Sequence, residues 1–214
     1  MLLCACWNFS CGKANSPSEY PAAVELVFKD EAAVDSLMQA EIFKTRLEPF
    51  RWKNHLVFFG NAAEVTRIAA EAGHLPLKDK KLYTKPLYAY YKTRYCQDTT
   101  TAATWRHYLL TANLVEDTAL QREYLRYHEK QFTEWPEVAQ GFCHAGFQQL
   151  LVFRDGRQLM LVISIPADRT LDELNPKTTE DNPRMDEWNQ RMGRYQEGIA
   201  GTAPGEVWVF LEPF

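Results

Sequence analysis

The chain has 214 residues and a mass of 24.8 kDa, and 46% of its residues are hydrophobic, with 11 prolines and 10 glycines. This composition excludes a disordered or collagen-like chain and indicates one large domain or two small ones. A net charge of −4 provides no global basic field for nucleic acid or anionic lipid, and the longest apolar runs, such as residues 159–166, are far shorter than the roughly 20 residues of a membrane-spanning helix.

The beginning of the chain is rich in cysteine, because Cys4, Cys6 and Cys11 are three of the five cysteines in the sequence. The segment NFSCG around Cys11 resembles a bacterial lipoprotein cleavage site, where a small residue precedes a cysteine that becomes acylated. A signal peptide normally carries positive charge before its apolar segment, and residues 1–10 contain no Lys or Arg. Two interpretations follow. In the first, Cys11 carries a lipid anchor and the protein is a periplasmic or membrane-anchored bacterial lipoprotein. In the second, the segment is a disordered leader, and the alternative location is the cytoplasm.

After a tether over residues 13–21, the remaining cysteines are Cys96 and Cys143. Two cysteines so far apart in the sequence do not make a disulfide framework. We therefore draw no inference about the redox compartment from them.

The first half of the chain predicts the order β-α-β-(β)-α-β. Asp30 is a good N-cap for a helix that runs to Arg46, and Asn61 caps a second helix that ends at Gly73. Runs rich in β-branched and aromatic residues predict the strands, which are expected at residues 24–29, 50–54, 55–60 and 81–96.

The second half repeats this order after a polar linker at residues 98–103. Asp155-Gly156 lies between two β-rich runs and is the strongest hairpin signal in the chain. Helices are expected over residues 117–131 and 135–144 and from Asn182 to Tyr195, and strands over residues 107–116, 149–153, 158–165 and 205–214.

The order of these elements predicts an α+β fold with antiparallel sheets, in which two ferredoxin-like (βαββαβ) units follow each other. The predicted parts are a leader over residues 1–21, a first unit over residues 22–97 and a second unit over residues 104–214. The two halves share this pattern but not their residues, so the repeat is inferred from topology.

The helix predicted over residues 117–131 places Tyr124 and His128 one turn apart on the same face, about 5–6 Å apart at Cβ. A histidine has an unperturbed pKa of about 6.5 and can exchange a proton near neutral pH. A phenol beside it can orient a hydroxylated ligand. The alternative is a partly buried histidine that simply forms a hydrogen bond with a tyrosine.

The late helix carries Trp188 and Met192 at a spacing typical of a core, although an indole can also stack on the C–H face of a sugar. Trp135 precedes Pro136 at a helix start and is expected to pack in the core. The sequence contains no P-loop, no G-x-G-x-x-G after a strand, no G-x-S-x-G, no H-E-x-x-H and no C-x-x-C. We therefore predict no metal site.

Taken in order, several short blocks resemble the L-rhamnose mutarotase family over residues 107–214. They are Tyr124-x-x-x-His128, Trp135-Pro136-Glu137, Ala145-Gly146, the hairpin, Asn182-Pro183-Arg184 through Trp188, and Gly205-Glu206-Val207-Trp208. The resemblance implies a ferredoxin-like unit of the dimeric α/β-barrel type, which commonly dimerises through its sheet. It also implies interconversion of the α and β anomers of L-rhamnose without a cofactor.

By this resemblance, His128 matches the proton donor of the family, and Tyr124 and Trp188 match substrate-binding residues. We add Tyr127, on the same helix as His128, as a candidate substrate contact. Three departures bear on the identity of the sugar. The interval from His128 to Trp135 is longer than the usual pattern, Leu150 stands where a second substrate tyrosine is expected, and Asn189 stands where some members carry a second tryptophan.

The sequence thus predicts an isomerase, an aldose mutarotase acting on L-rhamnose or a similar 6-deoxy sugar by histidine general acid/base catalysis. The alternative is a non-catalytic sugar-binding or sensing lipoprotein on the same fold. A third possibility is a cofactor-free monooxygenase on this scaffold. The first half is expected to be a degenerate partner unit that covers the sheet, in a monomeric pseudo-dimer or a homodimer.

Overall fold

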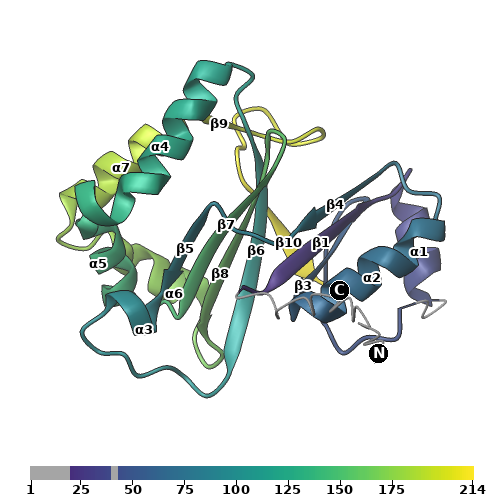
Figure 1. Ribbon diagram of the computed structural model, residues 1–214, viewed down its shortest axis with the longest axis horizontal. Coiled ribbons are helices and arrows are strands. Elements are labelled where there is room, and N and C mark those ends of the chain that lie inside the picture. The colour runs from purple at the N-terminus through teal and green to yellow at the C-terminus, as the bar shows by residue number, and fades with distance from the viewer. Residues whose placement is uncertain (1–19, 40–42) are drawn as a thin grey trace, which may run out of the picture.

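The computed structural model describes residues 20–39 and 43–214, and the cysteine-rich leader with Cys11 lies outside them. Within the described residues, the chain forms an α+β structure with ten antiparallel strands (Figure 1). The prediction of a ferredoxin-like α+β fold is therefore confirmed.

The first group of strands has the order β4-β1-β3-β2, which is the order of a ferredoxin-like sheet. Along β1 the side chains alternate, so Val24 and Leu26 face the helices while Ala23 and Glu25 face the opposite side. Asn61 accepts hydrogen bonds from two backbone amides at the start of α2, as predicted. The elements are β1 (Ala22–Val27), α1 (Glu31–Gln39), β2 (Pro49–Trp52), β3 (His55–Gly60), α2 (Ala62–Glu71), the 3₁₀ turn η1 (Ala72–His74) and β4 (Asp79–Tyr83).

The second group repeats this arrangement in the order β10-β6-β8-β7. Gly156 adopts φ +57° in the tight turn between β7 and β8, a conformation that glycine tolerates without strain. The elements are β6 (Trp105–Leu114), α4 (Thr118–Glu134), α5 (Pro136–His144), β7 (Gln149–Asp155), β8 (Gln158–Pro166), α6 (Leu171–Leu174), η2 (Asn175–Thr178), α7 (Pro183–Gly193), β9 (Gln196–Glu197) and β10 (Val209–Pro213).

The two groups join through β2 and β10, where Arg51 pairs with Glu212. On the other side of the molecule β4 lies against β7, with the rings of Tyr83 and Phe153 6.2 Å apart. Apolar side chains from both sheets form one core between them. Figure 1 shows the helices on the outer faces, α1 and α2 on the first sheet and α4, α5 and α7 on the second.

Three predicted boundaries differ from the structure. The helix is expected to end at Arg46, but the backbone is irregular from Phe43. There the Thr45 hydroxyl donates a hydrogen bond to Glu64 of α2 and accepts one from the backbone amide of Leu47. The extended segment expected over residues 81–96 is interrupted after β4, because Pro86 cannot donate a backbone hydrogen bond. The last strand begins at Val209 rather than at Gly205, because residues 203–206 form a turn.

The interrupted segment continues as β5 (Tyr88–Tyr91) and a single helical turn, α3 (Lys92–Tyr95). β5 pairs with β7, with Tyr88 opposite Val152 and Tyr90 opposite Leu150. It therefore lies in the second sheet, although the order of elements in the sequence predicts it in the first unit.

Cys96 and Cys143, from which the sequence yielded no inference, form a disulfide that fastens the end of α3 to α5. Their 47-residue separation in the chain concealed this contact, which depends on the pairing of β5 with β7. The bond thereby fixes the segment that follows β5 against the outer helices of the second sheet.

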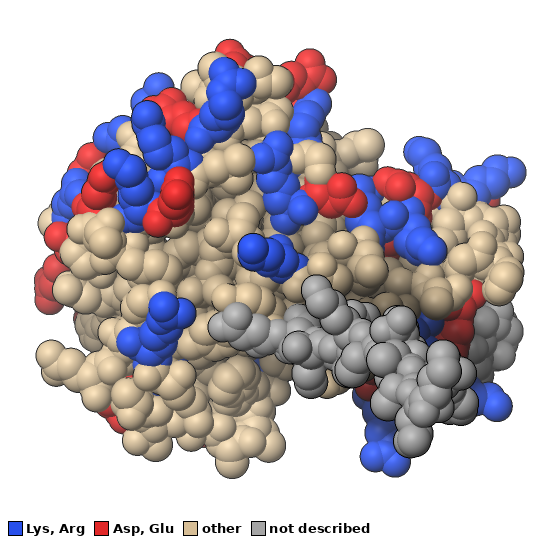
Figure 2. All heavy atoms as spheres, in the orientation of Figure 1, with Lys and Arg blue, Asp and Glu red and all other residues tan. Residues whose placement is uncertain are grey.

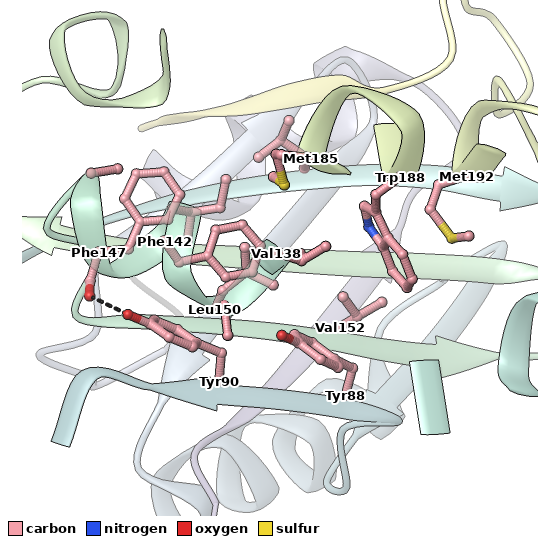
Figure 3. Close-up of a cluster of buried hydrophobic side chains, with 14 of the residues drawn as sticks. Tyr88, Tyr90, Val138, Phe142, Phe147, Leu150, Val152, Met185, Trp188 and Met192 are labelled. Atoms are coloured by element: carbon pink, nitrogen blue, oxygen red, sulfur yellow. Dashed lines mark hydrogen bonds between the residues drawn. The ribbon is translucent and has the colours of Figure 1, made fainter. Parts of the chain in front are cut away.

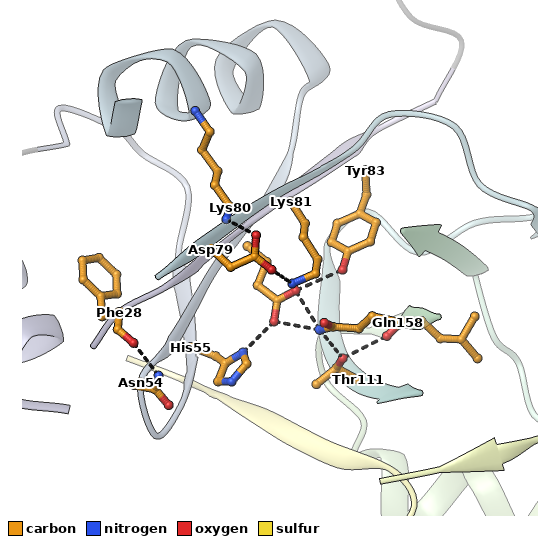
Figure 4. A network of polar contacts seen from close by, with 11 residues as sticks. Phe28, Asn54, His55, Asp79, Lys80, Lys81, Tyr83, Thr111 and Gln158 are labelled. Atoms are coloured by element: carbon orange, nitrogen blue, oxygen red, sulfur yellow. Dashed lines mark hydrogen bonds and ion pairs between the residues drawn. The ribbon is translucent and has the colours of Figure 1, made fainter. Parts of the chain in front are cut away.

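A buried polar network crosses the space between the sheets (Figure 4). Glu25 is fully buried on β1, and its carboxylate contacts His55 Nδ1 at 2.7 Å and accepts from Tyr83 at 3.0 Å. From the second sheet, Gln158 Nε2 donates to both carboxylate oxygens at 2.9 and 2.8 Å. Burial alone would raise the pKa of Glu25, but the hydrogen bond and charge of His55, together with Lys81, hold it below its usual value.

Replacing Glu25 should strongly destabilise the protein, because it leaves buried side chains that contact its carboxylate, such as Tyr83 and Gln158, without their hydrogen-bond acceptor. We expect Glu25→Ala to lower the free energy of unfolding by about 3–5 kcal/mol in urea titrations at pH 7. Because the pKa of Glu25 is lower in the folded than in the unfolded chain, its ionised carboxylate stabilises the fold at pH values above the unfolded pKa, near 4.5. This stabilisation is lost as the pH falls through the folded pKa. Glu25→Gln, which keeps the shape, should lack this acid-dependent component. If the free energy of unfolding fell equally with pH in the wild type and in Glu25→Gln, the assignment of this component to Glu25 would be wrong.

Candidate active site

A cavity of about 400 Å³ lies on the helix-covered face of the second sheet. Its floor comes from β7 and β8, its roof from α4, α5 and α7, and its sides from β5 and the segment before β10. The walls are mostly apolar, with Leu161, Ile163, Met185 and Met192 among them. This volume lies within the range of about 300–1,000 Å³ that is typical of small-molecule sites.

His128 lies in the wall of this cavity and is only 8% exposed. Its Nδ1 is 3.1 Å from the backbone carbonyl oxygen of Tyr124, and because a carbonyl only accepts, Nδ1 carries the proton. Burial lowers the pKa of His128 to about 4, and the hydrogen bond to Tyr124 only partly opposes that effect. The imidazole is therefore neutral at neutral pH and retains Nε2 as a proton acceptor.

The structure brings Tyr124 and Trp188 to the same cavity as His128. The ring centroids of Tyr124 and His128 are 4.2 Å apart, and those of His128 and Trp188 are 5.2 Å apart. Burial raises the pKa of Tyr124, so its phenol stays protonated and can both donate and accept a hydrogen bond. Three of the four residues predicted for the sugar site thus surround one space.

Tyr127, the fourth, does not line the cavity. Its hydroxyl accepts a hydrogen bond from Arg191 Nη1 at 2.6 Å, and its ring lies 6.3 Å from that of Trp188. Trp135 is buried, as predicted for a core side chain, and its ring centroid is 5.6 Å from that of Trp188. Tyr127 and Trp135 therefore support Trp188 from behind.

Further polar side chains line the cavity without having been predicted as site residues, among them Tyr88 of β5, Gln131 of α4, Asn175 and Gln196. Gln131 follows His128 by three positions, so helical periodicity could have identified it. Tyr88 precedes the family-like segment, and only the pairing of β5 with β7 brings it here. Leu150 and Asn189, two of the departures from the family pattern, also line the cavity.

The outer surface of α4 and α7 carries both signs of charge, interspersed in Figure 2. Ion pairs there include Lys130–Glu134 at 2.9 Å and Arg184–Glu187 at 2.7 Å. Among the residues that the structure describes, no group of three or more His, Cys, Asp or Glu could hold a metal ion. In the same part of the chain, no helix combines the length and apolar character needed to cross a membrane.

The arrangement suits a small neutral ligand with hydroxyl groups. It offers a neutral proton acceptor at His128, the phenols of Tyr88 and Tyr124 and the indoles of Trp188 and Trp208, within a largely apolar lining. A charged ligand would lose its hydration without gaining an ionic partner among these groups.

Known proteins resemble the second half of the chain, which forms most of the cavity. A family model, rhaM, described as L-rhamnose mutarotase, matches residues 107–214. An L-fucose mutarotase of Xanthomonas campestris pv. campestris is 34% identical over 98 residues, which cover 45% of this chain and 75% of that protein. A UPF0734 protein of Dictyostelium discoideum is 29% identical over 109 residues, 51% of this chain and 85% of that protein.

Among solved structures, a putative monooxygenase from Fusobacterium nucleatum subsp. nucleatum aligns with a TM-score of 0.45 and 11% identity, over 90% of each chain. A heme-degrading enzyme from Listeria monocytogenes aligns with a TM-score of 0.41 and 8% identity, over 91% of this chain and all of that chain.

The imidazole of His128 should titrate near pH 4 when its ring resonances are followed by NMR, with His128→Asn identifying the signal. Its folded-state pKa lies below the ordinary value of 6.5, so the unfolded chain binds this proton more readily. The stability that neutral His128 provides should therefore be lost as the pH falls from about 6.5 towards 4. A titration midpoint near 6.5 would contradict the burial of this side chain.

Proposed function

Because the chain belongs to the L-rhamnose mutarotase family, we propose that it is an aldose mutarotase that interconverts the α and β anomers of a 6-deoxy sugar such as L-rhamnose. It is thus an isomerase. The observation that carries the proposal is the neutral imidazole of His128, which lines a cavity together with Tyr124 and Trp188.

Anomer exchange requires two proton movements. The hemiacetal opens when a base removes the proton from the anomeric hydroxyl, the bond between C1 and the ring oxygen breaks, and the ring oxygen takes up a proton. In our proposal Nε2 of His128 accepts the first proton. The imidazolium then returns a proton to the ring oxygen, directly or through a water or a substrate hydroxyl. The open aldehyde rotates and closes by the reverse steps on its other face, so protons balance.

The low pKa of His128 limits its strength as a base but keeps it unprotonated at neutral pH. This fits a reaction that already proceeds slowly in water. A positioned acid or base typically contributes a factor of about 10²–10⁴, which is the scale of help that such a reaction needs.

The walls of the cavity support a 6-deoxy sugar as substrate. Trp188 offers its indole for stacking on the C–H face of the ring, and Tyr124 offers a protonated phenol to a hydroxyl. Apolar side chains such as Met185 and Ile163 provide a surface for a methyl group in place of a hydroxymethyl group. The departures at Leu150 and Asn189 affect the choice of sugar rather than the proton transfer.

We also propose that the first sheet takes the place of a dimer partner, which makes the chain a monomeric pseudo-dimer. The continuous pairing from β2 to β10 supports this, as does the shared apolar core between the sheets. The inner face of the second sheet is thereby covered within one chain.

The catalytic role of His128 can be tested by NMR saturation transfer between the anomer signals of free reducing sugars. We expect His128→Asn to lower kcat/KM by a factor of about 10²–10⁴ without unfolding the protein. His144→Asn, at an exposed histidine outside the cavity, should behave like the wild type. Exchange by His128→Asn at the wild-type rate would exclude His128 as the acid/base. Calorimetric sugar binding by the wild type without faster exchange would instead select the sugar-binding alternative.

The disulfide between Cys96 and Cys143 supports a proposal about location, since such bonds persist in oxidising compartments. We propose an exported protein, anchored through acylated Cys11. Mass spectrometry of the mature N-terminus should detect a diacylglyceryl group on Cys11. A mature chain that keeps residues 1–10 without lipid would overturn the anchor.

Replacing both Cys96 and Cys143 by Ser should lower the free energy of unfolding by about 2–4 kcal/mol.

A further inference from the structure

Two buried polar side chains of the cavity have no hydrogen-bond partner. They are Tyr88, through its hydroxyl, and Gln131, through both Oε1 and Nε2 of its amide. Tyr88 is 5% exposed and Gln131 is fully buried. Because buried polar groups in proteins are nearly always hydrogen-bonded, such groups in the wall of a cavity indicate that a ligand satisfies them.

The two groups are neighbours and adjoin the proposed base. Burial raises the pKa of Tyr88, and the nearby Gln131 amide partly opposes this, although the two make no well-formed hydrogen bond. The rings of Tyr88 and His128 are 5.5 Å apart, and Gln131 lies one helical turn beyond His128 on α4. His128, Tyr88 and Gln131 therefore line the same part of the cavity.

Both residues come from places where the chain departs from the family pattern. Tyr88 precedes the segment that matches the family model, and Gln131 lies in the lengthened interval between His128 and Trp135. By the family resemblance, a substrate tyrosine is expected near Leu150, which lies in the floor of the cavity and is apolar. Tyr88 and Gln131 thus supply polar groups to a cavity whose floor is apolar at Leu150.

The strand that carries Tyr88 is held firmly. Its backbone pairs with β7, and the disulfide fastens the turn that follows it to α5. Figure 3 shows Tyr88 rising from this edge strand beside Val152, with Trp188 descending from α7 on the other side of the enclosed space. Tyr88 and Trp188 therefore approach the ligand space from opposite walls.

We propose that Tyr88 and Gln131 bind hydroxyl groups of the sugar and so determine which sugar is accepted, which means that a segment outside the mutarotase-like half completes the site. This inference rests on the proposed mutarotase function. A phenol donates one hydrogen bond and accepts others, and a carboxamide donates through Nε2 and accepts through Oε1. Together they match neighbouring hydroxyl groups of a pyranose.

The test compares Tyr88→Phe and Gln131→Met with Tyr90→Phe in the full chain, by anomer exchange over a panel of reducing sugars and their deoxy analogues. Tyr90 is a matched control on the same strand: it does not line the cavity, and its hydroxyl contacts Cys96 Sγ at 3.0 Å and donates to the Phe147 carbonyl at 3.4 Å.

For Tyr88→Phe and Gln131→Met we expect KM to rise about 3–10-fold with kcat within twofold, because an interaction made equally in the ground and transition states is lost. The difference in KM between variant and wild type should vanish for a deoxy sugar that lacks the hydroxyl group bound by the replaced side chain. Tyr88→Phe should also melt about 2–4 °C higher, since it removes an unpartnered buried hydroxyl. Tyr90→Phe should keep its KM and melt at a lower temperature.

The outcomes separate this inference from the proposed function. If the wild type exchanges a sugar and both variants keep its KM over the panel, the pair holds only water or structure and the inference is wrong. If the wild type exchanges no sugar, calorimetry decides. Weaker sugar binding by Tyr88→Phe than by the wild type then still supports the pair, whereas equal binding, or no binding by the wild type, overturns it.

Discussion

The burial of two sheet faces against each other is the constraint on which the rest of this structure depends. A four-stranded antiparallel sheet covered by helices on one side leaves an apolar face on the other, and here each sheet covers that face for its neighbour. The pairing of β2 with β10 closes one seam, and the carboxylate of Glu25 meets Gln158 across the interior. Because the inner faces are used in this way, the ligand cavity must lie on an outer face, between sheet and helices.

The chemistry of that cavity follows from the burial of His128 in a mostly apolar lining. The imidazole of His128 has its Nδ1 proton committed to the helix backbone, and its surroundings do not stabilise a positive charge. The outcome is an uncharged proton acceptor beside a protonated phenol and an indole. Such a set suits a neutral ligand with hydroxyl groups, and in the proposed mechanism a single histidine acts without a carboxylate in contact.

The cavity also has a wall from outside the segment that matches the family model. β5 belongs in sequence to the connection between the two units, yet it extends the second sheet at its edge and lines the cavity. A strand added at a sheet edge brings every second side chain to the helix-covered face, so Tyr88 and Tyr90 both point there. The disulfide keeps this added wall in place.

Local sequence determined most of the elements, because helix caps such as Asn61 and Asn182 and the Asp155-Gly156 turn depend only on neighbouring residues. It also placed Tyr124 and His128 on one face, since that requires only helical spacing. Tertiary structure decided the position of β5, the bond between Cys96 and Cys143, and the convergence of Tyr88 with Gln131. These depend on contacts between segments far apart in the chain, which no local spacing encodes.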